Sequence, residues 1–78
     1  MADNWQRRIS IDAGVLGGKP VIAGTRIAVE FIVERLGRGW TEAQIREDYD
    51  HISPEDIHAC LMYAAEMLRS EKVYLLPA

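Results

Sequence analysis

The sequence predicts a mainly α fold, in which a short N-terminal β-hairpin precedes three helices arranged as a helix-turn-helix. Three observations lead to this fold class. Apolar and polar residues alternate with a period of two near the N-terminus, as in a half-buried strand. From residue 29 the apolar residues recur at helical spacing. Two N-capping residues, Thr41 and Ser53, indicate the starts of two further helices.

The hairpin is expected within residues 9–27. Ile9 and Ile11 alternate with polar residues, and a glycine-containing stretch follows. Val21-Ile22 and the segment 25–27 flank Ala23-Gly24, which indicates a two-residue turn. Alanine disfavours a turn that needs positive φ at both central residues, so we expect a type II turn or a slightly longer loop with only Gly24 at positive φ.

The first helix is predicted over about residues 28–37, with Gly37 or Gly39 as its stop. The second, over about 42–49, begins at Thr41, and Gln44 three residues later completes a capping box. It is expected to bury Ala43, Ile45 and Tyr49.

The third helix is predicted over about residues 54–69. Ser53 is its N-cap, Pro54 occupies the first helical position, and two acidic residues follow in the first turn. Its core-facing stripe is expected to comprise Ile57, Cys60, Leu61, Ala64 and Leu68.

A chain of 78 residues forms one domain, here assigned to residues 9–70 between an N-terminal arm (1–8) and an apolar C-terminal tail (71–78). A domain this short buries only about 60% of the surface that its unfolded chain exposes. Cys60 is the only cysteine, which excludes an internal disulfide, and no residues have metal-ligand spacing. With a hydrophobic content of 49%, association is the remaining way to gain stability, and we expect a homodimer.

The start of the chain lacks the apolar region of a secretory signal, and no stretch is long enough to span a membrane. Together with the single cysteine, this favours a cytoplasmic protein. The net charge of -3 argues against a non-specific nucleic-acid binder.

Enzymatic motifs are incomplete. Gly17-Gly18-Lys19 lacks the first glycine of a phosphate-binding loop, and Pro20 stands where its magnesium-binding hydroxyl should be. Cys60 is expected in the core, away from His58, so no nucleophile and base are paired. We therefore expect a protein without enzymatic activity, metal or cofactor.

Five basic residues are candidate contacts to DNA phosphates. They are Arg7, Arg8, Lys19, Arg26 and Arg46. The alternative is that they are solvated, or pair with Asp12 and Glu30. The third helix is poorly equipped to read bases, because its expected exposed positions include three acidic residues and only one basic residue, Arg69.

A second group of residues extends the apolar surface and is a candidate dimer or partner interface, since methionine-rich surfaces adapt to partners. The group comprises Met62, Tyr63, Met67, Val73, Tyr74, Leu75 and Leu76. The alternative for the helical members is a well-buried helix.

The motif Gly18-Lys19-Pro20-x-Ile22-x-Gly24-Thr25-Arg26-Ile27, followed by Gly39-Trp40-Thr41 and Ser53-Pro54-Glu55-Asp56-Ile57, resembles the bacterial domain-of-unknown-function 433 family over roughly residues 9 to 66. Asp50 departs from the family, in which many members carry proline at this turn.

The resemblance implies a homeodomain-like or winged helix-turn-helix fold and an antitoxin of the VapB type. Such a protein binds and silences a PIN-like ribonuclease toxin and, as a dimer, represses its own operon. The resemblance also implies that Arg26 has either a structural role or a role in an interface, and both remain open. The alternatives are a DNA-binding regulator without a toxin and a small oligomerisation module.

Overall fold

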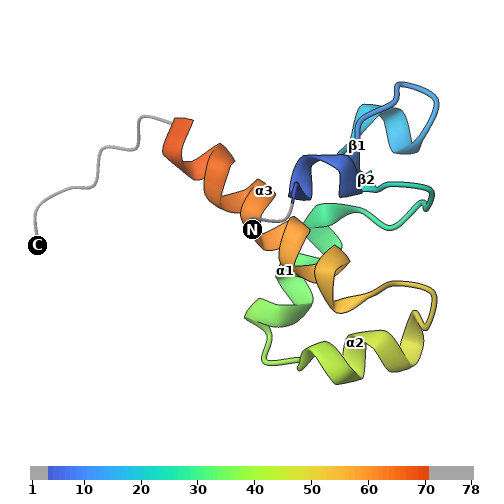
Figure 1. The fold of residues 1–78 in the computed structure, drawn as a ribbon, viewed down its shortest axis with the longest axis vertical. Coiled ribbons are helices and arrows are strands. Elements are labelled where there is room, and N and C mark those ends of the chain that lie inside the picture. The colour runs from blue at the N-terminus through green and yellow to red at the C-terminus, as the bar shows by residue number, and fades with distance from the viewer. Residues whose placement is uncertain (1–3, 71–78) are drawn as a thin grey trace, which may run out of the picture.

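The computed structural model describes residues 4–70, and three helices follow a small antiparallel sheet (Figure 1). The elements in chain order are the 3₁₀ helix η1 (Trp5–Arg8), β1 (Ile9–Ser10), the 3₁₀ turn η2 (Leu16–Gly18), β2 (Val21–Ile22), α1 (Val29–Gly37), α2 (Glu42–Asp48) and α3 (Pro54–Ser70). The three predicted helices are therefore present. None of the described helices is long and apolar enough to cross a membrane.

The sheet pairs β1 with β2, with Ile9 opposite Ile22 and Ser10 opposite Val21. The predicted pairing of Val21-Ile22 with residues 25–27 is wrong. Beyond the bond that closes the turn, those segments are joined by one backbone bond of 2.9 Å, from Ile22 N–H to the Ile27 carbonyl, and by an isolated bridge between Val21 and Ala28.

Thr25 explains why no second ladder forms. Its hydroxyl donates to the Ile22 carbonyl at 2.7 Å and accepts from the Ile27 amide at 3.0 Å. Side-chain bonds of this kind compete with strand pairing. The turn itself is as expected, because the Thr25 amide bonds the Ile22 carbonyl at 3.0 Å and Gly24 has φ +79°.

Replacing Gly24 with alanine is expected to lower the free energy of unfolding by about 1–2 kcal/mol, because an L-residue is strained at positive φ. No atom lies within 4 Å of the added Cβ, so the effect is one of backbone conformation alone. Gly37→Ala is the matched control, because it adds a Cβ in equally open space at an ordinary helical position. Urea denaturation should show this control to be neutral or stabilising, and equal losses would contradict the explanation.

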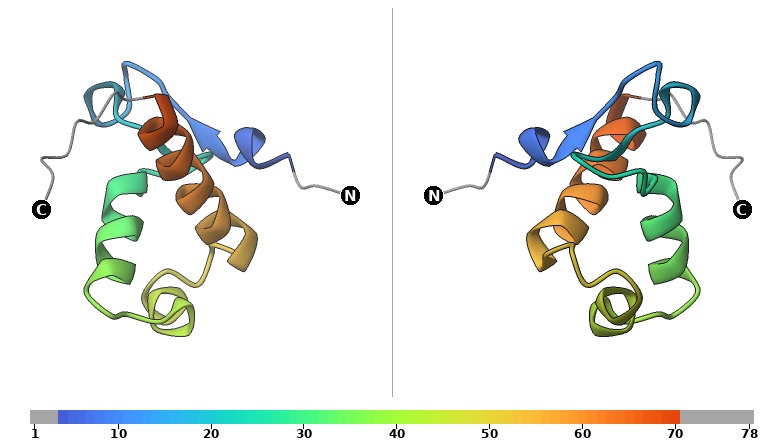
Figure 2. Two further views of the ribbon diagram at one scale, coloured as in Figure 1. Left: turned by 90° about the vertical axis from the view of Figure 1, so that its left-hand side faces the viewer. Right: turned by 90° about the vertical axis from the view of Figure 1, so that its right-hand side faces the viewer.

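The core lies among β2, α1, α2 and the first half of α3, and Figure 2 shows how the three helices are arranged around it. Its buried members are Ile22, Val29, Ile32, Ile45, Ile52, Ile57 and Cys60. In α2, Ile45 is buried and Tyr49 half-buried at its end, but Ala43 is exposed.

The predicted stripe of α3 is only half correct. Ile57 and Cys60 are fully buried, but Leu61 and Leu68 are 43% and 65% exposed. Leu68 is exposed because the C-terminal part of α3 extends past the body of the domain (Figure 1). Leu61 lies in the first half of α3, where the buried side of the helix is turned toward Ala59 and η1 instead. Ala59, which the stripe omitted, is buried because η1 packs against α3.

Both predicted N-caps are present. Thr41 and Gln44 exchange hydrogen bonds of 3.1 and 2.8 Å, which completes the capping box of α2. At the start of α3, the Asp56 amide donates to Ser53 Oγ at 3.2 Å, and the Ser53 amide donates to Asp56 Oδ2 at 2.9 Å. Asp56 therefore closes a second capping box.

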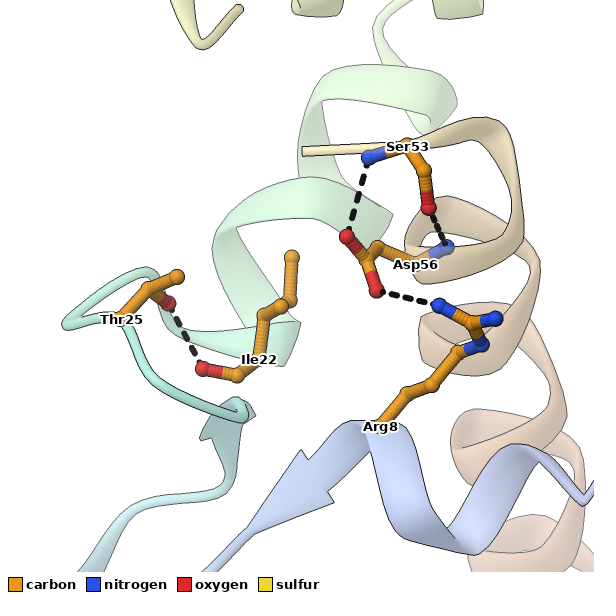
Figure 3. Close-up of polar contacts among 5 residues, drawn as sticks. All are labelled: Arg8, Ile22, Thr25, Ser53 and Asp56. Atoms are coloured by element: carbon orange, nitrogen blue, oxygen red, sulfur yellow. Dashed lines mark hydrogen bonds and ion pairs between the residues drawn. The ribbon is translucent and has the colours of Figure 1, made fainter. Parts of the chain in front are cut away.

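The N-terminal arm is tied to this cap. Arg8 Nη1 donates to Asp56 Oδ1 at 3.2 Å, so one carboxylate bonds both the cap of α3 and η1 (Figure 3). The Trp5 ring also meets Tyr63 of α3 edge-on, with centroids 6.5 Å apart. Residues 5–8 are thus part of the folded domain.

Candidate protein-binding surface

An apolar groove lies between α1 and the second half of α3. It has a volume of about 230 Å³. Its lining residues are Pro20, Val29, Glu30, Val33, Tyr63, Ala64 and Met67. We call it the α1–α3 groove. The Glu30 carboxylate is exposed and bonds Lys19 Nζ at 2.8 Å, so the charge in this lining is paired.

A second hollow, of about 290 Å³, lies on the other side of Tyr63. Trp5, Gln6, Ile9 and Ile11 form the rest of its lining. Tyr63 is therefore a ridge between two apolar depressions, and Ile11, at 62% exposed, continues the apolar surface onto the loop after β1.

Exposed apolar residues of α3 extend this surface along the projecting part of the helix. Met67 is 45% exposed and Leu68 is 65% exposed. Single exposed apolar residues are ordinary, but a contiguous set next to a groove is typical of a binding surface. The structure thus brings together Tyr63 and Met67 of the predicted interface. Val73, Tyr74, Leu75 and Leu76 lie outside the described residues.

Met62 lies elsewhere. Successive residues of an α-helix point about 100° apart, so Met62 does not face the α1–α3 groove that Met67 lines. It lines a different cleft, together with Trp5 and His58. The predicted interface is therefore split between two faces of one helix.

The five basic residues that the sequence singled out differ in their ion pairing. Arg8 is paired with Asp56, and Lys19 with Glu30, as the alternative interpretation of Lys19 anticipated. Asp12 instead accepts the Gly14 amide at 2.8 Å. Within residues 4–70, three of the cations are exposed and form no ion pair. These are Arg7, Arg26 and Arg46.

The Gly18–Ile27 motif builds the approach to α1. Gly18 has φ +90°, and the Pro20 carbonyl accepts the Val29 amide at 3.0 Å, which satisfies one of the free N–H groups at the helix start. Thr25 closes the turn, as described above. Arg26 is exposed and lines a shallow hollow beside Phe31 and Tyr49.

The structure places Cys60 and His58 in different environments. Cys60 is fully buried, and burial, with a smaller contribution from the charge of Asp56, raises the pKa of its thiol to about 12. His58 Nε2 lies 3.0 Å from Glu42 Oε1, which links α3 to α2. Residues 4–70 contain no group of three histidine, cysteine or carboxylate side chains that could hold a metal ion.

Residues 4–70 form a small helical domain with an apolar face that no described residue covers. The chain belongs to the family described as protein of unknown function (DUF433), whose model matches residues 9–64. The match confirms the resemblance seen in the motif.

A solved structure supports the same assignment. The chain is similar to a DUF433 member protein from Anabaena variabilis, with 30% sequence identity and a TM-score of 0.76. The similarity covers 82% of this chain and 63% of the other, so the chain spans less than two thirds of that protein's length. The comparison with curated proteins gives no match.

Proposed function

We propose that this chain is the antitoxin-like member of a bacterial toxin–antitoxin pair, and that it binds its toxin through the α1–α3 groove and the exposed apolar face of α3. The observation that carries the proposal is the apolar surface around Tyr63, which residues 4–70 leave uncovered. The family resemblance supplies the class of partner, a PIN-like ribonuclease.

In this proposal the antitoxin inhibits the ribonuclease by binding alone, without a catalytic step of its own. A side chain of the toxin would fill the groove between Val33 and Met67, and the flexible thioether of Met67 would adapt to it. Half-buried Tyr63 would serve as a rigid anchor, the role that aromatic residues often have at interfaces.

The scaffold in this proposal is homeodomain-like. A short connection, residues 49–53, joins α2 to α3, and α3 is the longest of the three α-helices, which is the arrangement that a helix-turn-helix would need. Base reading by α3 is disfavoured, since Glu55 and Glu66 are exposed on it. Binding of operator DNA stays a prediction, for which Arg7, Arg26 and Arg46 are the available cations.

Met67→Lys is expected to weaken toxin binding at least about tenfold, because it places a charge against an apolar contact. Met62→Lys is the matched control, since it introduces the same charge on another face of the same helix. The measurement is co-purification after co-expression with the protein encoded by the adjacent gene, with relief of growth arrest as a second readout.

Two results would count against the proposal. If the unaltered chain neither co-purifies with the adjacent gene's product nor relieves growth arrest, the antitoxin function is wrong. If both lysine variants bind as well as the unaltered chain, the toxin is bound by another surface.

A further inference from the structure

A third depression, of about 670 Å³, lies between the N-terminal segment and α3. Asn4, Trp5 and Gln6 form one wall, and the other is formed by α3 side chains that include Glu55, His58 and Met62. The function proposed above makes no use of this cleft.

The α3 wall of the cleft belongs to a longer stripe along the helix. Glu55, His58, Met62, Glu66 and Arg69 follow one another at spacings of three and four residues, which places them on one face. This outer stripe points away from the buried side of α3, where Ile57 and Cys60 face the core. Met62, at its centre, is an apolar side chain left 40% exposed.

Charges along the outer stripe are distributed unequally about Met62. Glu55 and His58 precede it, and Glu66 and Arg69 follow it, at equal separations of seven and four residues on either side. The Glu66 and Arg69 side chains are 49% and 65% exposed, and that of His58 is 60% exposed. Within the chain, Arg69 Nη1 bonds Glu66 Oε1 at 2.6 Å and His58 Nε2 lies 3.0 Å from Glu42 Oε1, so a second molecule would meet these groups as exposed pairs.

We propose that a second copy of this chain binds along the outer stripe, with the two α3 helices antiparallel and crossing at Met62. In a two-fold symmetric pair of antiparallel helices, residues equally distant from the crossing point on opposite sides face each other. Glu55 of each copy then faces the Glu66–Arg69 pair of the other, with Arg69 directly opposite Glu55. A parallel pair would instead place Glu55 against Glu55 and Arg69 against Arg69, which is repulsive.

The same register fills the cleft. The projecting end of α3, from Glu66 to Arg69, lies along residues 55–58 of the second copy, beside the wall formed by Asn4 and Trp5. The α1–α3 groove stays open in this dimer, because Met67 points to another face. Self-association and toxin binding are therefore separable, and either can fail without the other.

Charge reversal tests the register. Glu55→Arg and Arg69→Glu should each raise the dimer dissociation constant at least about tenfold, because each places like charges in contact. The double variant, Glu55→Arg with Arg69→Glu, reverses both partners and should return the constant to within about threefold of the original. Sedimentation velocity measures the constants, circular dichroism confirms folding, and Glu47→Arg on exposed α2 is the control that should change neither.

Cross-linking provides a second measurement that does not depend on charge. Met62→Cys should form an intermolecular disulfide under mild oxidation, since residues at the crossing point come within the reach of about 4.4–6.8 Å between Cα atoms that a disulfide requires. The unaltered chain is the internal control, because Cys60 is buried. Met67→Cys, on the other face, should not cross-link.

Three results would overturn the proposal. One is a chain that stays monomeric at high micromolar concentration. Another is a double charge variant that associates no better than the single ones. The last is a Met67→Cys variant that cross-links as fast as Met62→Cys.

Discussion

Asp56→Ala is expected to lower the free energy of unfolding by about 2–3 kcal/mol. Asp56 accepts the Ser53 amide as part of the capping box and also binds the Arg8 guanidinium (Figure 3). Its side chain is only 17% exposed, so water replaces these bonds poorly. Native domains of this size are stable by only about 0.05–0.15 kcal/mol per residue, and the loss is a large part of that total.

Two controls separate the roles of Asp56. Ser53→Ala removes the hydroxyl cap and leaves the ion pair, and should lower stability by about 1 kcal/mol. Asp48→Ala removes an exposed carboxylate at the C-terminal end of α2 and should change stability by less than about 0.5 kcal/mol. Urea denaturation measures all three. If Asp56→Ala is no worse than Ser53→Ala, the bond to Arg8 contributes nothing to the fold.

Cys60 in the native protein is expected to react with thiol reagents at pH 8 about a thousandfold more slowly than in the unfolded chain. Only the thiolate reacts, and a pKa of about 12 leaves almost none at this pH. Burial adds to the protection, because the reagent must wait for the domain to open. Reaction with iodoacetamide in buffer and in urea gives the two rates, and equal rates would show that the core around Cys60 is open.

The same pKa gives stability a pH dependence. The thiol ionises near pH 8.5 in an unfolded chain and near 12 in the native one. The native state therefore holds its proton while the unfolded state loses it, so the contribution is complete below about pH 8.5 and declines as pH rises toward 12. Denaturation midpoints measured between pH 7 and 10 should fall, and Cys60→Ala should remove this part of the decline.

Local signals explain which features of the fold were predictable. Thr41, Ser53 and Gly24 act through their immediate neighbours, and the helix starts and the turn geometry were expected from them alone. The partner of β2 depends on a contact with β1 across an intervening loop, and no adjacent residue signals it. For α3, the apolar period indicates which side faces the core, but not that the body ends before Leu68.

The candidate surface was predictable to a similar degree. Apolarity selected Met62, Tyr63 and Met67, and their spacing could have separated Met62 from the other two, since five residues turn a helix by about 140° from Met62 to Met67. Two contacts that shape this surface and the adjoining cap are not indicated by any neighbouring residue in the sequence. Trp5 reaches Tyr63 from the N-terminal arm, and Arg8 reaches Asp56 across 48 residues of sequence.

Pro20 has two roles that use different atoms. Its carbonyl holds the first turn of α1, while its ring is part of the α1–α3 groove. Val33 and Met67, also in the groove, contribute nothing to the approach turn, which Thr25 and the backbone close. Substitutions at Val33 and Met67 can therefore change what the groove binds without disturbing the approach turn, so the motif identifies the scaffold and not its partner.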